Sequence, residues 1–201
     1  MVPLDELEDS KHSSRLPRVA VWIAITAVVV AIGFVALRPT ASEIGPGSAA
    51  PEFDLPLLAG AGRIDSEGLR GKAVVLNFWA SSCYSCKEEA PVLDRAWRDY
   101  KDEGVVVLGV NVARDSAVAA QRFADAFGMT FPLVKDEGGQ LARALGINDA
   151  FLPQTFFIDR EWKLASLFSG KVLSDAGGST VLGPVTAKSL RNQIESMLRE
   201  T

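Results

Sequence analysis

Two continuous apolar runs stand out in the middle of the chain. Residues 73–79 (AVVLNFW) and 105–112 (VVVLGVNV) are short and rich in β-branched side chains, and neither run alternates with polar positions. Such runs are typical of strands that are buried on both faces of a sheet. We therefore expect two central strands at these positions.

Amphipathic segments lie between and after these runs. The helical spacing of apolar positions begins at Cys83 and continues to about Lys101, with an interruption at Pro91. Ser116 and Gly128 are suited to begin and end a second helix. The order of segments predicts an α/β sandwich with a mixed central sheet. The expected elements are helices over residues 83–101, 116–127, 140–145 and 186–199, and further strands over 131–134, 155–158 and 164–168, whereas 172–184 is Gly/Ser-rich and unassigned.

A long uncharged segment lies near the N-terminus. Residues 19–37 (VAVWIAITAVVVAIGFVAL) end at Arg38, and a helix of this length would span ~28 Å, close to the hydrocarbon core of a bilayer. This length favours an uncleaved transmembrane anchor over a cleaved signal segment or a buried soluble helix.

The flanking charges predict the orientation of this anchor. Lys11, Arg15 and Arg18 precede the segment, and only Arg38 follows closely, so the N-terminus is expected in the cytoplasm. We therefore expect a single-pass cell-membrane protein. Its predicted parts are a cytoplasmic tail (1–18), the anchor (19–37), a flexible linker (38–50) and an extracytoplasmic domain (51–201).

The composition excludes several kinds of chemistry. The 201 residues carry a net charge of -4, and nothing in this balance suggests a nucleic-acid partner, which would need a clustered basic surface. The one histidine, His12, precedes the apolar segment, which excludes histidine-based triads and metal sites from the main domain. Two cysteines alone cannot complete a zinc site. We expect no metal and no cofactor.

The two cysteines, Cys83 and Cys86, lie where the first buried strand gives way to a helix. The positive end of a helix dipole and its unpaired N–H groups favour a thiolate there. Cys83 is expected to be the exposed attacking thiol and Cys86 the buried resolving thiol of a redox-active disulfide. A purely structural disulfide is the first alternative, although so short a loop restrains the unfolded chain little. Binding of Cu(I) by two thiolates is the second, without a nearby Met or His to support it.

The segment FWASSCYSC at residues 78–86, followed by KEEAP, resembles the active-site segment of TlpA/ResA-type membrane-anchored thiol–disulfide oxidoreductases. APEF at 50–53, LPQTFFID at 152–159 and the strand–helix–strand block near 105–134 fit the same pattern. The resemblance covers roughly Pro51 to the C-terminus. It implies a thioredoxin-like three-layer sandwich.

The resemblance also implies roles for individual residues. Pro153 would be a cis-proline that faces the dithiol, and the Leu152 backbone would pair with an extended substrate segment. Glu89 would lie near the buried cysteine and exchange protons with it, whereas a solvated surface acid is the alternative. We also assign Trp79 to the substrate-binding residues, although packing in the core is the ordinary role of an aromatic there.

Three positions depart from the family pattern. Ser82 replaces the usual Trp before the first cysteine, and Ser85 replaces the common Pro before the second. Asn77 stands where thioredoxins proper have a buried acid, so Glu89 is expected to be the nearby proton carrier. These changes affect the redox potential and the choice of partner more than the dithiol chemistry.

The resulting hypothesis is a membrane-tethered reductant of disulfides in exported proteins. The membrane anchor motivates this direction, since an integral membrane electron donor could reduce the pair again. The family resemblance implies apocytochrome c as a target, during cytochrome c maturation. A peroxiredoxin-like peroxidase is one alternative, although Ala80–Ser82 lacks the Thr that those enzymes place before the cysteine. A non-enzymatic scaffold or metal carrier is the other.

Overall fold

The computed structural model describes residues 18–36, 45–147, 151–169, 180–182 and 185–199. The chain divides into two units, Met1–Ser42 and Glu43–Thr201. The first contains the helix α1 (Arg18–Ala36), which coincides with the helix expected over residues 19–37. Within the described ranges, none of the helices combines the length and the apolar character needed to cross a bilayer. The membrane anchor stays a prediction from the sequence.

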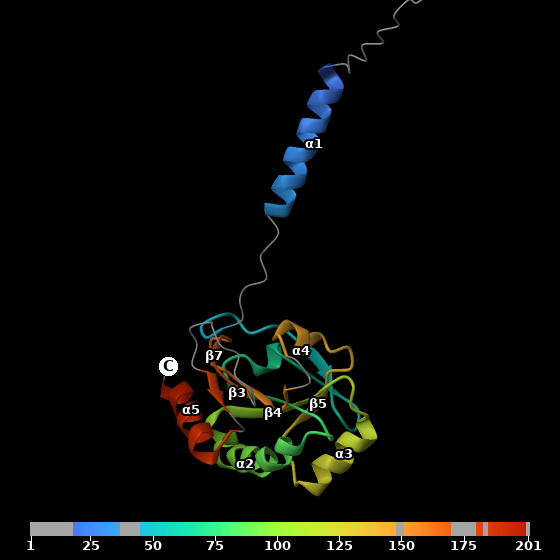
Figure 1. The fold of residues 1–201 in the computed structure, drawn as a ribbon. Helices are drawn as coiled ribbons and strands as arrows, with labels where there is room; N and C mark the ends of the chain where they lie inside the picture. Colours follow the sequence, from blue (N-terminus) through green and yellow to red (C-terminus); the bar gives the residue numbers. More distant parts are fainter. Residues whose placement is uncertain (1–17, 37–44, 148–150, 170–179, 183–184, 200–201) are drawn as a thin grey trace, which may run out of the picture. The chain divides into compact units, whose positions relative to one another are not determined.

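A six-stranded mixed sheet forms the centre of the second unit (Figure 1). Its strand order is β5-β4-β3-β6-β7-β8. β3 pairs in parallel with β4 and antiparallel with β6, which confirms the mixed sheet. The strands are β3 (Ala73–Trp79), β4 (Val105–Asn111), β5 (Leu133–Lys135), β6 (Gln154–Ile158), β7 (Leu164–Ser169) and β8 (Thr180–Leu182).

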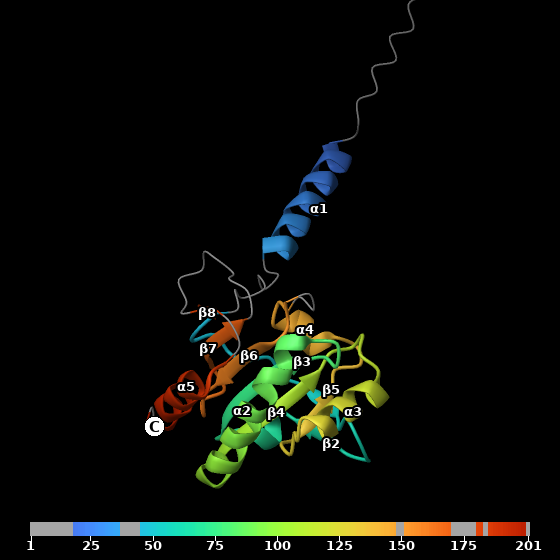
Figure 2. The same cartoon turned by 60° about the horizontal axis from the view of Figure 1, so that its bottom comes forward.

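The two central strands are buried along their whole length, as their continuous apolar runs predicted. Helices cover both faces of the sheet, so the three-layer arrangement is confirmed (Figures 1 and 2). Val75 packs on the face covered by Leu93 and Ile194, and Leu76 packs on the opposite face with Leu141. The helices of this unit are α2 (Tyr84–Tyr100), α3 (Ala117–Ala126), α4 (Gln140–Ala144) and α5 (Ala187–Arg199).

Several elements were not expected from the sequence. β1 (Asp54–Pro56) and β2 (Arg63–Asp65) form a small antiparallel sheet, and two short 3₁₀ helices occupy Glu67–Leu69 and Lys101–Glu103. β8 lies in the stretch 172–184 that we left unassigned, where residues 172–179 and 183–184 are outside the described residues. Each of these elements is three residues long, which is too short to leave a periodic signal in the sequence.

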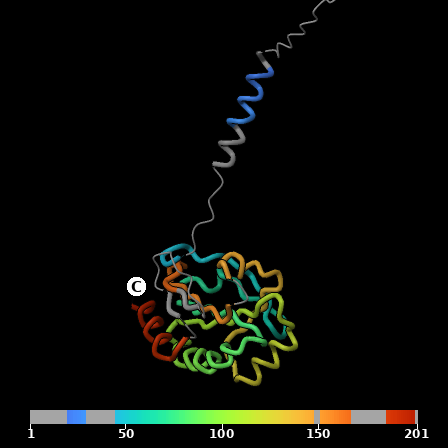
Figure 3. Tube along the Cα trace, in the orientation of Figure 1, coloured from blue at the N-terminus to red at the C-terminus, as the bar shows by residue number. Residues whose placement is uncertain are grey.

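The end of the predicted linker belongs to the folded unit. The N–H of Gly47 donates to the Leu164 carbonyl at 2.7 Å, and the N–H of Ala50 donates to the Trp162 carbonyl at 2.9 Å. This part of the chain therefore runs beside the turn between β6 and β7, as the cyan and orange traces of Figure 3 show. Trp162 is 2 % exposed and has a φ of 65°, a conformation that favours glycine.

Candidate active site

The two cysteines lie at the junction between the central strand β3 and the helix α2 that follows it in the chain. β3 ends at Trp79, a short loop follows, and Cys83 is the N-cap of α2. Its sulfur accepts a hydrogen bond from the backbone N–H of Cys86 at 3.1 Å. This contact satisfies one of the N–H groups that a helix start leaves without a partner. The predicted position of the dithiol at a helix N-terminus is confirmed.

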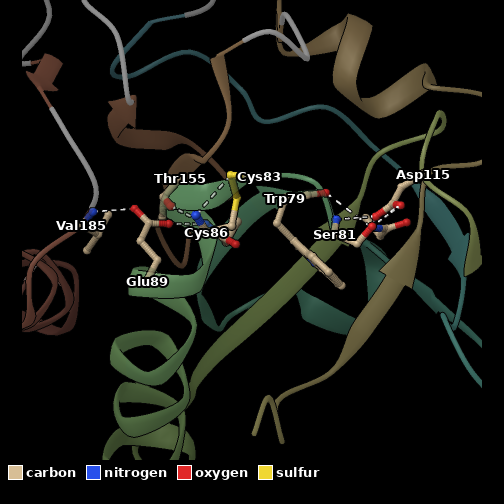
Figure 4. The surroundings of a disulfide bond; sticks show 10 residues. Trp79, Ser81, Cys83, Cys86, Glu89, Asp115, Thr155 and Val185 are labelled. Atoms are coloured by element: carbon tan, nitrogen blue, oxygen red, sulfur yellow. Dashed lines mark hydrogen bonds between the residues drawn. A yellow bond between two sulfur atoms is a disulfide. The ribbon is translucent and has the colours of Figure 1, made fainter. Parts of the chain in front are cut away.

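Cys83 and Cys86 form a disulfide with a Cα–Cα distance of 5.4 Å, so the structure shows the oxidised state (Figure 4). The two sulfur-bearing residues differ in access to solvent. Cys86 is 4 % exposed, whereas Cys83 is half-buried and adjoins Tyr84, which is 74 % exposed. An external nucleophile or disulfide therefore has better access to Cys83 than to Cys86.

The loop before β6 lies beside this disulfide. The peptide bond between Leu152 and Pro153 is cis, as the family resemblance implied. β6 runs antiparallel to β3, with Gln154 paired to Phe78, so Pro153 adjoins the end of β3 where the dithiol loop begins. Leu152 and Cys83 pack against the same apolar cluster. The structure thus brings together the two motifs that carried the resemblance.

The carboxyl group of Glu89 is buried one helical turn after Cys86. The Glu89 side chain accepts hydrogen bonds from Asn77 Nδ2 at 2.9 Å and from the backbone N–H of Val185 at 2.5 Å. Burial raises the pKa of Glu89 to about 7, and the hydrogen bonds from Val185 and Asn77, which lower it, do not offset this effect. Glu89 is therefore a buried acid rather than the solvated surface acid that was the alternative.

Asn77 connects Glu89 to the neighbouring strand. It lies on β3 opposite Thr155 of β6, and its Nδ2 also donates to Thr155 Oγ1 at 2.8 Å. Both residues are almost completely buried. The sequence singled out Asn77 and Glu89 separately, and Thr155 only as part of a motif. Nothing in the sequence indicated that Val185 would contact Glu89.

Trp79, which we assigned to the substrate-binding residues, is only 1 % exposed. Its ring packs against that of Phe123 from α3, with 5.1 Å between the ring centroids. A side chain that is enclosed in this way cannot touch a substrate, so this assignment was wrong. Trp79 supports the dithiol loop from inside the core.

The comparisons with known proteins agree with this geometry. The model of the AhpC/TSA family matches residues 46–166. The thiol-disulfide oxidoreductase ResA of Geobacillus kaustophilus is 31% identical over 165 residues, which cover 82% of this chain and 92% of that protein. The ResA protein of Bacillus subtilis is 37% identical over 128 residues, covering 64% of this chain and 69% of that protein.

A solved structure shows the same fold. The crystal structure of a protein described as a thiol:disulfide interchange protein DsbE, from Chlorobium tepidum, is similar with a TM-score of 0.64 and 27% sequence identity. The match covers 78% of this chain and 99% of that chain. The thioredoxin-like sandwich is therefore shared across the whole of that protein.

Proposed function

The chain belongs to the AhpC/TSA family and, within it, to the ResA-type thiol–disulfide oxidoreductases, and from this membership we propose that it reduces disulfides in exported proteins. The activity of the family is the exchange of a dithiol for a disulfide. In this chain, Cys83 and Cys86 form the pair that carries it out. The observation that carries the proposal is the asymmetry of the pair, with an accessible Cys83 at the start of α2 and an enclosed Cys86 behind it.

The reaction has two exchange steps. In the reduced protein, the thiolate of Cys83 attacks one sulfur of a substrate disulfide, that S–S bond breaks, and the other substrate sulfur leaves as a thiolate. The thiolate of Cys86 then attacks the Cys83 sulfur and displaces the second substrate thiolate. The substrate gains two electrons, and the protein ends in the disulfide form described above.

Glu89 is suited to the proton transfers of this cycle. A thiol of Cys86 must lose its proton before it can attack, and a carboxyl group with a pKa of about 7 can accept a proton or return it near neutral pH. Glu89 lies three residues after Cys86 on α2, a spacing that places both on one helix face. In this proposal, Glu89 is the proton acceptor for Cys86.

Leu152 and Pro153 are proposed to bind the substrate. Leu152 packs against the same apolar cluster as Cys83 and is only half-buried. An extended substrate segment that hydrogen-bonds the Leu152 backbone would present its disulfide to Cys83, in the manner of strand addition.

The proposal also states where the catalytic domain lies and which protein it reduces. The uncharged segment 19–37 and the basic residues before it support a single-pass anchor with the cytoplasmic N-terminus and an extracytoplasmic catalytic domain. In that location, an integral membrane electron donor would keep the pair reduced. The resemblance to the family supports the disulfide of an apocytochrome c as a target, before haem is attached.

Two experiments test this proposal, the first on the purified chain and the second in cells. The midpoint potential of the Cys83–Cys86 pair should lie well below the roughly −120 mV of a dedicated oxidant, and a value near that figure would rule out the reductant role. In cells, a Cys86→Ser variant should accumulate mixed disulfides with its substrates, because the resolving thiol is missing. The matched Cys83→Ser variant should trap none, and the trapped proteins identify the target.

A further inference from the structure

A second polar cluster lies on the opposite side of the disulfide from Glu89, with Ser81 and Asp115 at its centre (Figure 4). One of its members is Lys135 of β5, whose side chain is buried (8 % exposed). The Lys135 ammonium donates to Asn111 Oδ1 at 2.7 Å, to the Val112 carbonyl at 2.6 Å and to the Asp115 carbonyl. Lys135 therefore fixes the backbone of the loop between β4 and α3.

Asp115 lies in that loop and binds the segment that leads to the cysteines. Its carboxylate accepts hydrogen bonds from the Ser81 N–H at 2.6 Å, from Ser81 Oγ at 2.7 Å and from Asn111 Nδ2 at 2.8 Å. Burial raises the pKa of Asp115, but these hydrogen bonds and the charge of Lys135 outweigh it and hold the pKa below its ordinary value. Asp115 is therefore an anion at neutral pH.

The contact between Asp115 and Ser81 bears on the position of the attacking sulfur. Ser81 is two residues before Cys83, and the Cys83 N–H donates to the Ala80 carbonyl at 3.1 Å in a tight turn. On its other side, the Trp79 carbonyl accepts from the Val112 N–H at 3.2 Å. The segment that Lys135 fixes thus holds the dithiol loop at Trp79, where the loop begins, and at Ser81, two residues before Cys83.

We propose that Asp115 and Lys135 are positioning residues for Cys83, which hold the dithiol loop through Ser81 and set the stability of the Cys83 thiolate through their opposite charges. This inference rests on the disulfide-exchange role of Cys83. Hydrogen bonds to a charged group contribute more than neutral ones, so a carboxylate that accepts two from Ser81 holds the loop more firmly than a neutral side chain would.

Other charged groups close to this cluster have different contacts. The carboxylate of Asp136, which follows Lys135, accepts from the N–H groups of Gln140 and Ala142 at the start of α4. Arg114, beside Asp115 in the chain, has an exposed side chain. Lys135 is also the charged group whose Coulombic effect lowers the pKa of Asp115. The Lys135–Asp115 pair is therefore the one to vary.

The test is the pH dependence of alkylation of Cys83 by iodoacetamide in the reduced, purified chain. Asp115→Asn leaves the Lys135 cation without its counter-charge, so the thiolate fraction below the thiol pKa should rise about threefold. Lys135→Met leaves the Asp115 anion, so that fraction should fall about threefold. The double variant should lie within about twofold of the parent chain.

The opposite signs separate this role from general loosening of the loop, which would move both variants in the same direction. Asp125→Asn and Lys188→Met alter exposed charges and are the matched controls. Shifts of the same sign in the two single variants, or shifts no larger than those of the controls, would overturn the proposal.

If a buried-charge variant does not fold, Asp115→Glu keeps the charge and moves the carboxylate by one methylene. The alkylation rate constant of the thiolate should then fall at least about threefold, because the loop is displaced while the charge is retained. An unchanged rate constant would contradict the proposal. Iodoacetamide needs no protein partner, so the result is independent of the physiological substrate and of the direction of electron flow proposed above.

Discussion

The carboxyl group of Glu89 accepts a hydrogen bond from the backbone N–H of Val185, a residue 96 positions later in the chain. Glu89 lies on α2 beside the dithiol, and Val185 lies two residues before the start of α5. This contact joins the C-terminal part of the fold to the acid that we propose as the proton acceptor for Cys86. It also means that the protonation state of Glu89 bears on the stability of the fold as well as on the reaction.

The pH dependence of stability follows from the raised pKa of Glu89. The contribution of Glu89 to the free energy of unfolding is fully present below its pKa of 4.5 in the unfolded chain. It is lost as the pH rises through its folded-state pKa of about 7. The free energy of unfolding of the oxidised chain should therefore decrease between pH 5 and 8, by on the order of 3 kcal/mol from this group. Urea denaturation at several pH values measures it. The decrease should be absent from Glu89→Gln, and an equal slope in both proteins would show that Glu89 does not titrate in this range.

Replacing Asn77 by aspartate would place a second carboxyl group within hydrogen-bond distance of the Glu89 carboxyl group. Two such groups cannot both ionise without strong repulsion, so the pKa of one of them should rise well above 7 and that group should stay protonated at neutral pH. We expect Asn77→Asp to lose about 2 kcal/mol of stability at pH 8 and less at pH 5. Asn192→Asp, on the exposed face of α5, should show no such difference.

The unequal burial of the two cysteines predicts unequal reactivity after reduction. Cys83 is half-buried and Cys86 is 4 % exposed, so a bulky maleimide should label Cys83 at least about tenfold faster than Cys86. Peptide mapping by mass spectrometry after brief labelling distinguishes the two sites. Equal labelling would mean that Cys86 is accessible in the reduced chain and would remove the basis for the assigned order of attack.

Trp162 has a φ of 65° and yet is 2 % exposed, with its ring beside that of Phe53 and under the guanidinium of Arg70. Trp162→Gly relieves the backbone conformation, a gain of about 1 kcal/mol, but removes the packing of a large aromatic residue, a loss of about 3–5 kcal/mol. Chemical denaturation should therefore show a net loss of stability for Trp162→Gly, and a smaller loss for Trp162→Phe. If the glycine variant is as stable as the parent chain, the free energy gained by relieving the backbone strain equals the free energy lost with the packing.

The sequence by itself determined the elements whose signal is local. The continuous apolar runs at 73–79 and 105–112 identified the two central strands, and the N-cap Ser116 accepts from the Ala119 N–H as the start of α3 required. The position of Cys83 between a buried strand and an amphipathic helix was likewise readable, because burial periodicity and capping depend on residues only a few positions apart.

Only the tertiary structure decided which distant side chains complete the site. Trp79 is as apolar as a substrate-binding aromatic residue would be, and the packing of Phe123 against it made it a core residue. The partners of Glu89 and Ser81, namely Val185 and Asp115, come from other elements and have no fixed spacing from the cysteines. Strand register and helix packing bring such residues together, and these depend on the whole buried core rather than on any local pattern.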